Sequence, residues 1–337
     1  MPNAFITGLS GVDLLPAERA FIAASRPAGI ILFARNCQSH EQIRQLVDDA
    51  RNAIGSEHAL VLIDQEGGRV QRLRPPLGRA LPAAALYGAL FAADPAEARR
   101  AAFLASRQTA ADLRALGINT NCAPVLDVPV AGSHNVIGNR AYGAAVEQVT
   151  ALGGAVADGL MAGGVLPVMK HIPGHGRGTA DSHHALPVVD TPRDVLDTTD
   201  FAPFRALAHL PAAMTAHVLY SAIDAERPAT TSPAVIDQVI RQAIGFDGLL
   251  MSDDVSMKAL SGSVGESAAA ALAAGCDLVL HCNGVLAEME AVATESPAMG
   301  GRVLARLEAA MAVLQRSEPY EQHLAEAAIE RVLSVSV

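Results

Sequence analysis

The chain has 337 residues, of which half are hydrophobic and 18% are charged, and its formal net charge is −10. This composition supplies the apolar side chains of a large core and excludes a disordered chain. The acidic and basic residues are mixed along the sequence without a basic stripe, so we expect no nucleic-acid partner. The length fits one large domain or two ordinary ones.

The N-terminus and the cysteines give no sign of export, membrane insertion or zinc binding. The stretch MPNAFITGLSGVDLL has no basic region and no cleavage site. The longest apolar runs fall short of the roughly 20 residues that cross a bilayer. The four cysteines (Cys37, Cys122, Cys276 and Cys282) lack the spacing of zinc ribbons or disulfide scaffolds, so we expect buried, reduced thiols. These features predict a soluble, cytoplasmic protein without a membrane partner.

Eight short apolar runs recur along the chain, and segments of helical periodicity separate them. They are AFIT (4–7), AGIILFA (28–34), ALVLID (59–64), INTNCAPVLDV (118–128), VLPVMKHI (165–172), AAMTAHVL (212–219), GLLMSDD (248–254) and LVLHCN (278–283). Apolar strands that alternate with helices are typical of a parallel sheet covered by helices. Eight such units favour an α/β fold of the closed (β/α)8 or TIM-barrel type over an open doubly wound sheet. A glycine-rich dinucleotide fingerprint is missing after the first run, which weighs further against the open sheet.

Several helices have recognisable ends. Ser39 precedes a helical apolar stripe, with Gln42 placed to complete a capping box, and Asp94 and Ser232 are start signals followed by proline. Four glycines that precede strands mark helix stops, namely Gly117, Gly164, Gly245 and Gly275. Beyond residue 284 the sequence is helical. We therefore expect residues 1–337 to form a single barrel domain, with a helical segment at about 285–337 packed on its outside.

Polar side chains stand at the ends of seven of the eight predicted strands, where barrel enzymes carry their chemistry. Any one of them is equally well explained as a surface charge or a structural ion pair. Charged groups at the end of an apolar run are costly to bury alone, so their recurrence predicts a shared polar cavity. The residues are Arg35, Asn36, Asp64, Glu66, Asp127, Lys170, His171, His217, Asp253, Asp254, His281 and Asn283.

The loop after the fifth strand is rich in glycine and histidine, in the stretch KHIPGHGRGTADSHHALP (170–187). Asp181 stands two residues before His183, and an aspartate can set the tautomer of a histidine as it does in hydrolase triads. A metal site is the alternative, because both residue types are metal ligands. The first strand lacks the His-x-His pair that is usual in metal-dependent hydrolase barrels, which places metal second. His175 and His184 receive no role.

The seventh strand ends in two adjacent aspartates, Asp253 and Asp254. Alternation along a strand would point them to opposite sides, so we expect only one to face the barrel mouth. A carboxylate nucleophile opposite a proton donor is the minimal equipment of a retaining glycosidase. Capping of the following turn by this pair is an equally weighted alternative.

Five motifs together resemble a known family. They are IDQEGGRVQRL (63–73), GINTNCAPVLDV (117–128), IGNRAYG (137–143), VMKHIPGHGRGTADSHHALP (168–187) and GLLMSDDVSM (248–257). In order and spacing they resemble the family 3 glycoside hydrolases, and within them the bacterial β-N-acetylglucosaminidases of the NagZ type. The similarity extends from about residue 29 to about residue 280. One departure is Ile172, where the family usually has phenylalanine.

The resemblance implies a role for each matching residue. Asp253 corresponds to the catalytic nucleophile, His183 to the general acid/base, and Asp181 to its partner in an Asp-His dyad. The positions that correspond to binding of the non-reducing N-acetylglucosamine are Asp64, Arg72, Arg140, Lys170 and His171. No metal and no other cofactor is implied, and we expect a monomer.

The resemblance also implies an activity. We expect an exo-acting, retaining β-N-acetylglucosaminidase that releases N-acetylglucosamine from peptidoglycan-derived muropeptides with a 1,6-anhydro-N-acetylmuramic acid end, during cell-wall recycling. Because the acid/base lies on a glycine-rich loop, we expect loop 173–186 to move and close over the substrate. The alternatives are a metal-dependent barrel hydrolase and a sugar-binding barrel without catalysis.

Overall fold

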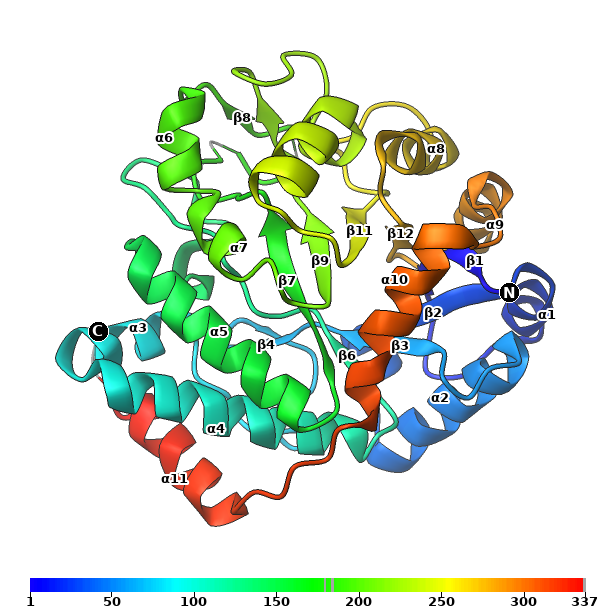
Figure 1. Ribbon diagram of the computed structural model, residues 1–337. Coiled ribbons are helices and arrows are strands. Elements are labelled where there is room, and N and C mark those ends of the chain that lie inside the picture. The colour runs from blue at the N-terminus through cyan, green and yellow to red at the C-terminus, as the bar shows by residue number, and fades with distance from the viewer. Residues whose placement is uncertain (179, 183–184, 336–337) are drawn as a thin grey trace.

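The computed structural model describes residues 1–178, 180–182 and 185–335. Eight parallel strands close a barrel in the order β1, β12, β11, β9, β7, β6, β3, β2, and helices surround it (Figure 1). The predicted (β/α)8 barrel is confirmed, and each strand lies within one of the eight apolar runs or overlaps it closely. The bounds are β1 (Asn3–Gly8), β2 (Pro27–Leu32), β3 (Leu60–Ile63), β6 (Thr120–Asn121), β7 (Leu166–Ile172), β9 (Ala212–Thr215), β11 (Leu249–Asp254) and β12 (Leu278–His281).

The barrel strands are buried along most of their length, which explains why their sequences are almost continuously apolar. Neighbouring strands are in parallel register, with Ile30 of β2 opposite Val61 of β3. These two strands approach so closely that a Cβ on Gly29 would lie 2.2 Å from the Leu60 carbonyl oxygen. A glycine at position 29 is therefore needed for β2 and β3 to pair.

Four short strands lie outside the barrel. A hairpin of β4 (Gln65–Gly67) and β5 (Val70–Gln71) follows β3 directly, and β8 (Val188–Val189) pairs in parallel with β10 (Leu219–Tyr220). The β4–β5 hairpin matters for function, because it turns the chain back over the C-terminal end of the barrel.

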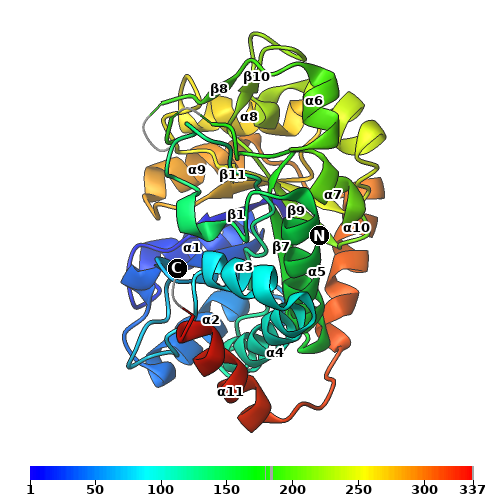
Figure 2. The same cartoon turned by 90° about the vertical axis from the view of Figure 1, so that its left-hand side faces the viewer.

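Helices cover the outside of the barrel (Figures 1 and 2). The α-helices before β12 are α1 (Pro16–Ser25), α2 (His40–Ile54), α3 (Ala84–Ala93), α4 (Pro95–Arg114), α5 (Val146–Ala162), α6 (Arg193–Thr198), α7 (Ala202–Ala206) and α8 (Val264–Ala274). A π-helix spans Val235–Ala243, and short 3-10 helices span Ala34–Asn36, Gly138–Arg140, Ala229–Thr231 and Ala312–Gln315.

The three predicted helix starts are confirmed by side-chain caps. The Ser39 hydroxyl accepts a hydrogen bond from the amide three residues on at 3.1 Å, and the Asp94 carboxylate does the same at 3.0 Å. The Ser232 hydroxyl caps the π-helix in the same way at 3.1 Å. Each cap satisfies an amide that has no partner within its helix.

The capping box predicted at Gln42 is wrong. The side-chain oxygen of Gln42 accepts a hydrogen bond from the backbone amide of Gln38, at 2.9 Å, and not from the backbone amide of Ser39. Its amide nitrogen also donates to the carbonyl of Asn36 at 3.1 Å and to that of Val12. These carbonyls draw the side chain away from the Ser39 amide, so Gln42 ties the loop after β2 to the start of α2.

The predicted helix stops are confirmed, because each of the four glycines adopts the left-handed conformation that favours glycine. The φ angles are 78° at Gly117, 71° at Gly164, 79° at Gly245 and 117° at Gly275.

The chain after β12 forms α9 (Leu286–Glu295), α10 (Gly301–Met311) and α11 (Gln322–Leu333). Helix α9 packs against α8 and β1, α10 contacts β11, and α11 lies against α4 and α3 (Figures 1 and 2). The segment before α11 is held by Arg107, whose guanidinium lies 4.2 Å from the centre of the Tyr320 ring. The C-terminal helices therefore contact the barrel over widely separated elements.

Within the described part of the chain, no helix is long and apolar enough to cross a membrane. All four cysteines are free thiols. The expected burial is confirmed for Cys122 and Cys276, whereas Cys37 and Cys282 are only partly buried.

Candidate active site

A cavity of about 300 Å³ opens at the C-terminal ends of the barrel strands. Seven of the eight site residues that the sequence predicts line it, and they come from five different parts of the chain. They are Asp64, Arg72, Arg140, Lys170, His171, Asp181 and Asp253. The eighth, His183, lies outside the described residues. The barrel therefore gathers in one place groups that lie almost 190 residues apart in sequence.

One wall of the cavity is formed by Asp64 and by two cations that make salt bridges with it. The Lys170 Nζ lies 2.8 Å from Asp64 Oδ1, and the Arg72 Nη2 lies 2.8 Å from Asp64 Oδ2. Burial by itself raises the pKa of Asp64, but the two cations outweigh burial and hold it well below its ordinary value. Asp64 is therefore a permanent carboxylate that fixes the direction of both cations.

Glu66 supports this wall without lining the cavity itself. Its Oε1 lies 2.7 Å from Lys170 Nζ, and its two oxygens accept from Arg140 Nη2 and Nε at 2.8 and 2.9 Å. Although burial raises the pKa of Glu66, Lys170 and Arg140 lower it to about 2. The result is a continuous ion chain of Arg72, Asp64, Lys170, Glu66 and Arg140.

Glu66 is a residue that the sequence marks only by its position after the third strand. The prediction assigned substrate binding to the other four members of the ion chain and gave Glu66 no role. The feature that could have indicated Glu66 is the hairpin. Glu66 lies in its first strand, β4, which begins directly after Asp64.

The hairpin is held in place by two buried amide side chains. Gln65 Oε1 accepts from the amides of Arg72 and Leu73, each at 3.0 Å. Asn121, at the end of β6, accepts from the Gln65 amide at 3.0 Å and donates to its carbonyl at 3.1 Å. These bonds fold the chain back, so that Arg72 returns to Asp64.

Arg69, at the tip of the hairpin, binds the neighbouring loop that precedes Arg140. Its Nη2 donates to the carbonyls of Asn135 at 3.0 Å and Ile137 at 3.1 Å, and also to that of Val136. Its Nε donates to the Asn139 side chain at 3.1 Å. We call residues 135–139 the rim loop. Arg69 thereby joins the element that carries Glu66 to the one that carries Arg140.

Phe33, which follows β2, places its ring against Arg72. The Arg72 guanidinium lies 5.0 Å from the centre of the Phe33 ring, and Arg35 lies 4.8 Å from the same ring. A guanidinium over an aromatic face is attracted by the ring's quadrupole. Phe33 therefore helps to orient Arg72 within the cavity, although the sequence analysis did not single it out.

The expectation of one shared cavity is wrong for several strand-end residues. Arg35 donates to the Leu9 carbonyl at 2.9 Å and to the Cys282 carbonyl, and Asn36 donates to the Leu9 carbonyl at 3.0 Å. His281 Nε2 lies 3.1 Å from Glu288, and Asn283 donates to the same carboxylate. Backbone carbonyls and helix α9 offer these side chains partners outside the cavity, so they tie loops together there.

Behind the cavity, Asp127 and His171 form a buried pair. Their contact is 2.7 Å between Asp127 Oδ2 and His171 Nδ1. The same carboxylate accepts from the amides of His171 and His175 through Oδ1, at 3.2 and 2.7 Å. Burial raises the pKa of Asp127, but His171 and His175 together lower it to about 2.

The two adjacent aspartates of β11 both line the cavity, so the prediction that only one faces the mouth is wrong. The reason is a register irregularity of β11 between Met251 and Asp254, which interrupts the alternation. Their environments nevertheless differ. Asp254 accepts from the amides of Ser256 and Cys282 at 3.0 and 3.1 Å and from the Ser256 hydroxyl at 2.8 Å. Asp254 therefore caps the turn, which is the structural alternative stated above.

Asp253 keeps more of its carboxylate available. Its Oδ1 accepts from the amide of Asp254 at 2.8 Å. Burial raises its pKa, but His217, His171, that amide and Lys170 lower it below the ordinary value. Asp253 is thus an ionised carboxylate at the mouth of the barrel, beside the cationic wall.

Asp181 lies on the rim of the same cavity, in the glycine-rich loop after β7. The next residue, Ser182, accepts a hydrogen bond through its carbonyl from the Ala259 amide at 3.2 Å. This bond attaches the loop to the segment that follows Asp253. The predicted closure of the loop stays a prediction.

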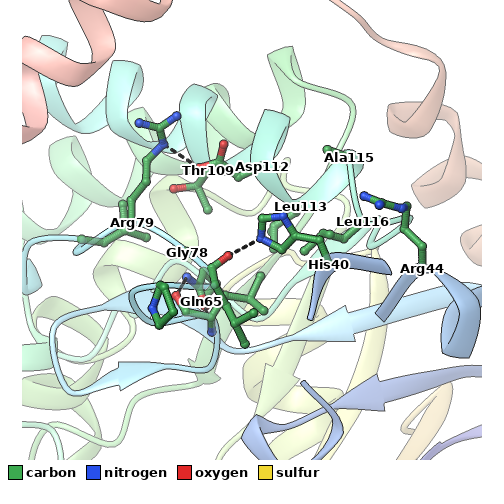
Figure 3. Close-up of a pocket in the computed structure, with 14 residues that line it drawn as sticks. His40, Arg44, Gln65, Gly78, Arg79, Thr109, Asp112, Leu113, Ala115 and Leu116 are labelled. Carbon is green, nitrogen blue, oxygen red and sulfur yellow. Dashed lines mark hydrogen bonds and ion pairs between the residues drawn. The ribbon is translucent and has the colours of Figure 1, made fainter. Parts of the chain in front are cut away.

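A second hollow of about 320 Å³ lies outside the barrel, between α2, α4 and the chain at 73–81 (Figure 3). Two of its polar side chains already have partners: Arg79 binds Asp112 (Figure 3) and Glu326, and His40 lies 2.6 Å from the Leu77 carbonyl (Figure 3). It contains none of the residues at the strand ends except the hairpin residue Gln65. The cavity at the barrel mouth is therefore the candidate active site.

Comparison with known families agrees with this geometry. The family model described as the glycosyl hydrolase family 3 N terminal domain matches residues 9–335. The chain belongs to glycoside hydrolase family 3.

Relatives of this family 3 enzyme include curated proteins named beta-hexosaminidase. That of Alkalilimnicola ehrlichii is 43% identical over 280 residues, covering 82% of this chain and 79% of the relative. That of Chromobacterium violaceum is 39% identical over 321 residues, covering 94% and 88%. Among solved structures, native NagZ from Neisseria gonorrhoeae superposes with a TM-score of 0.86 at 32% identity, covering 99% of this chain and 98% of NagZ. The predicted resemblance to the NagZ-type members of family 3 is confirmed.

In this family 3 hydrolase, the residues that the structure describes contain no group of three or more His, Cys, Asp or Glu side chains arranged to hold a metal ion. Asp64 and Glu66 are paired with Lys170, Arg72 and Arg140, and Asp127 is paired with His171. Asp253 lies beside these paired charges, and its Oδ1 accepts from the amide of Asp254.

Proposed function

We propose that this family 3 hydrolase is an exo-acting, retaining β-N-acetylglucosaminidase with Asp253 as its nucleophile. The observation that carries the proposal is the position of Asp253, an ionised carboxylate in a cavity walled by Arg72, Lys170 and Arg140. A retaining glycosidase needs such a carboxylate to form a covalent glycosyl-enzyme.

The proposed reaction has two steps. An Asp253 oxygen attacks the anomeric carbon and forms an ester, while protonated His183 gives its proton to the departing glycosidic oxygen. Neutral His183 then takes a proton from water, which attacks the same carbon and releases the sugar and the Asp253 carboxylate. Asp181 orients the imidazole and stabilises its protonated form. The dyad rests on the family resemblance, and the position of Asp181 on the cavity rim supports it.

The ion chain suits a single sugar ring. Arg72, Lys170 and Arg140 are donors only, and Asp64 is an acceptor, so together they can satisfy hydroxyl groups from both sides. Hydrogen bonds of this kind promote catalysis to the extent that they tighten in the distorted transition state. A cavity of about 300 Å³ is at the small end of ligand sites, which supports removal of one terminal residue at a time.

We place the substrate among peptidoglycan fragments. The names of the relatives, beta-hexosaminidase and NagZ, support a terminal N-acetylhexosamine. The proposed substrate is a muropeptide that carries N-acetylglucosamine on 1,6-anhydro-N-acetylmuramic acid, cleaved in the cytoplasm by a monomeric enzyme during cell-wall recycling.

The decisive test replaces Asp253 by alanine. We expect Asp253→Ala to lower kcat for a chromogenic N-acetyl-β-glucosaminide by at least about a thousandfold, because no ester can form. Added azide should restore turnover and give the α-glycosyl azide. A slow fluorosugar should label wild-type Asp253, which peptide mapping would locate. Asp277→Asn, at a buried aspartate that binds Arg241 and Arg306, is the control for a general loss of stability.

Three outcomes would contradict the proposal. Full activity of Asp253→Ala, or labelling of Asp254, would move the nucleophile elsewhere. Loss of wild-type activity on chelation would favour the metal-dependent alternative. Sugar binding by the wild type without turnover would favour a binding protein.

A further inference from the structure

Asp127 is placed to fix the ring proton of His171. It is completely buried, and its Oδ2 lies 2.7 Å from His171 Nδ1. A carboxylate accepts hydrogen bonds and cannot donate them. The ring must therefore donate through Nδ1, whatever the state of its second nitrogen.

The backbone brings the two residues together. The Leu126 amide donates to the Lys170 carbonyl at 2.7 Å, and the Lys170 amide donates to the Pro124 carbonyl at 3.0 Å. The segment before Asp127 thus continues the sheet alongside β7. Asp127 Oδ1 then accepts from the amides of His171 and His175. The carboxylate is held from two sides, so the direction of its second oxygen is fixed.

His171 also lines the cavity, and with Nδ1 on Asp127 the ring nitrogen left for a ligand is Nε2. Of its neighbours on that wall, Lys170, Arg72 and Arg140 can only donate, and Asp64 already accepts from Lys170 and Arg72. A sugar hydroxyl that accepts a hydrogen bond from one of these cations can still donate its own proton, and it needs an acceptor for it. A neutral imidazole with its proton on Nδ1 offers an acceptor at Nε2 for that proton.

We propose that Asp127 is a positioning residue that holds His171 as the Nδ1–H tautomer, so that Nε2 accepts a hydrogen bond from a hydroxyl of the bound sugar. The part of this inference that concerns the sugar rests on the proposed function. The part that concerns the tautomer does not, because it is a property of the free enzyme.

The variant Asp127→Asn separates positioning from a purely structural role. Asparagine has the same shape, and its side-chain oxygen can still accept from the amides of His171 and His175. Its NH₂ group, however, then faces His171 Nδ1 and requires that nitrogen to be unprotonated. The ring proton moves to Nε2, and the acceptor becomes a donor.

The tautomer can be measured directly by ¹⁵N NMR on enzyme with labelled histidine. The His171 signals are assigned by their loss in His171→Gln. We expect Nδ1 of the wild type to have a protonated shift and Nε2 an unprotonated one near neutral pH, with the order reversed in Asp127→Asn. An Nε2–H tautomer or a doubly protonated ring in the wild type would overturn the proposal.

Steady-state kinetics with a chromogenic N-acetyl-β-glucosaminide test the consequence for binding. We expect Asp127→Asn to raise KM about tenfold, which corresponds to one lost hydrogen bond, with a smaller change in kcat. In the His171→Gln background the same change should leave KM unaltered, because Asp127 acts through His171. An equal rise in KM in both backgrounds would show a structural role and overturn the proposal.

Asp277→Asn is the matched control. Asp277 is also a buried aspartate that accepts from a backbone amide, that of Leu250 at 2.9 Å, but it binds Arg241 and Arg306 away from the cavity. We expect this variant to lower the melting temperature without raising KM. If the wild type fails to cleave the sugar, the proposed function fails, whereas the NMR result still decides the tautomer.

Discussion

Glu66 shows how one buried side chain can organise several functional ones. It binds Lys170 through one contact and Arg140 through two, although sugar hydroxyls are the proposed partners of those cations. Without Glu66, Lys170 would retain only Asp64, and Arg140 would lose its two-point partner. Two-point contacts fix the plane of a guanidinium as well as its position. Glu66 is therefore expected to matter for binding without itself reacting.

We predict that Glu66→Gln raises KM about tenfold and lowers the free energy of unfolding by roughly 3 kcal/mol. The neutral amide cannot balance two buried cations, and breaking a buried ion pair has costs of this size. Steady-state kinetics and urea unfolding measure the two effects. Glu326→Gln, which removes a half-exposed partner of Arg79, should change neither by much. A change in Glu326→Gln as large as that in Glu66→Gln would argue against a special role for the ion chain.

The sequence identifies the kinds of residue in the site better than their pairings. Asp64, Lys170 and Asp253 were predicted to share a cavity because each ends an apolar strand, and they do. The partners of Lys170 and the contact between Asp127 and His171 could not be predicted. Those contacts depend on which strands are neighbours in the closed barrel and on side-chain directions, and neither is set by local sequence.

The β4–β5 hairpin and the rim loop illustrate cooperation between elements. Neither carries the proposed nucleophile, and both are short segments outside the barrel strands. Arg69 joins them through hydrogen bonds to three backbone carbonyls of the rim loop and to the side chain of Asn139. Arg140 directly follows the rim loop, so its direction depends on this attachment.

We predict that Arg69→Ala raises KM about threefold to tenfold, with little change in kcat, because a few partly exposed hydrogen bonds are lost. Hydrogen exchange of residues 135–139 should become faster. The control is Arg74→Ala, since Arg74 is an exposed arginine of the same region that binds the carbonyls of Arg69 and Gln71 and does not contact the rim loop. Unchanged exchange of the rim loop in Arg69→Ala would show that the loop is held by other contacts.

Elements were predictable where local rules decide them. The eight strands follow from apolar runs, and the helix stops follow from glycines that adopt positive φ. The capping box at Gln42 failed because carbonyls of a distant loop compete for the side chain. The alternation at Asp253 and Asp254 failed because the closed barrel introduces an irregularity in β11. In both cases a tertiary contact outweighed a local rule.

At the scale of the whole molecule, the buried charges connect stability to pH. His175 is buried beside His171, with 5.8 Å between the ring centres, and the structure gives its Nδ1 no hydrogen-bond partner. Burial lowers the pKa of His175 from 6.5 to about 4. The unfolded chain therefore takes up this proton at a higher pH than the folded enzyme does. The stability that His175 contributes is complete above pH 6.5 and is lost as the pH falls toward 4.

We predict that the wild type loses roughly 3 kcal/mol of unfolding free energy between pH 6.5 and 4 through this group, and that His175→Phe does not. Phenylalanine keeps a ring against His171 and cannot be protonated. Urea unfolding at several pH values across this window measures the difference. His58→Gln, at an exposed histidine, should keep the wild-type slope. Equal slopes in the wild type and in His175→Phe would refute the assignment.

A second acid-sensitive range belongs to the carboxylates. The pKa of Glu66 is lowered to about 2 by Lys170 and Arg140, and that of Asp127 is lowered to about 2 by His171 and His175, so their contribution is lost only as the pH falls below about 4. The stability linked to His175 is therefore lost at a higher pH than the stability linked to these two carboxylates. The two pH ranges can be measured separately.

The lowered pKa of Asp253 has opposite effects on the two halves of the proposed reaction. A less basic carboxylate is a weaker nucleophile, which slows formation of the ester. The same property makes it a better leaving group when water attacks that ester, because the departing negative charge is stabilised by the Asp254 amide and by Lys170. The charges around the cavity thus favour hydrolysis of the covalent intermediate over its formation.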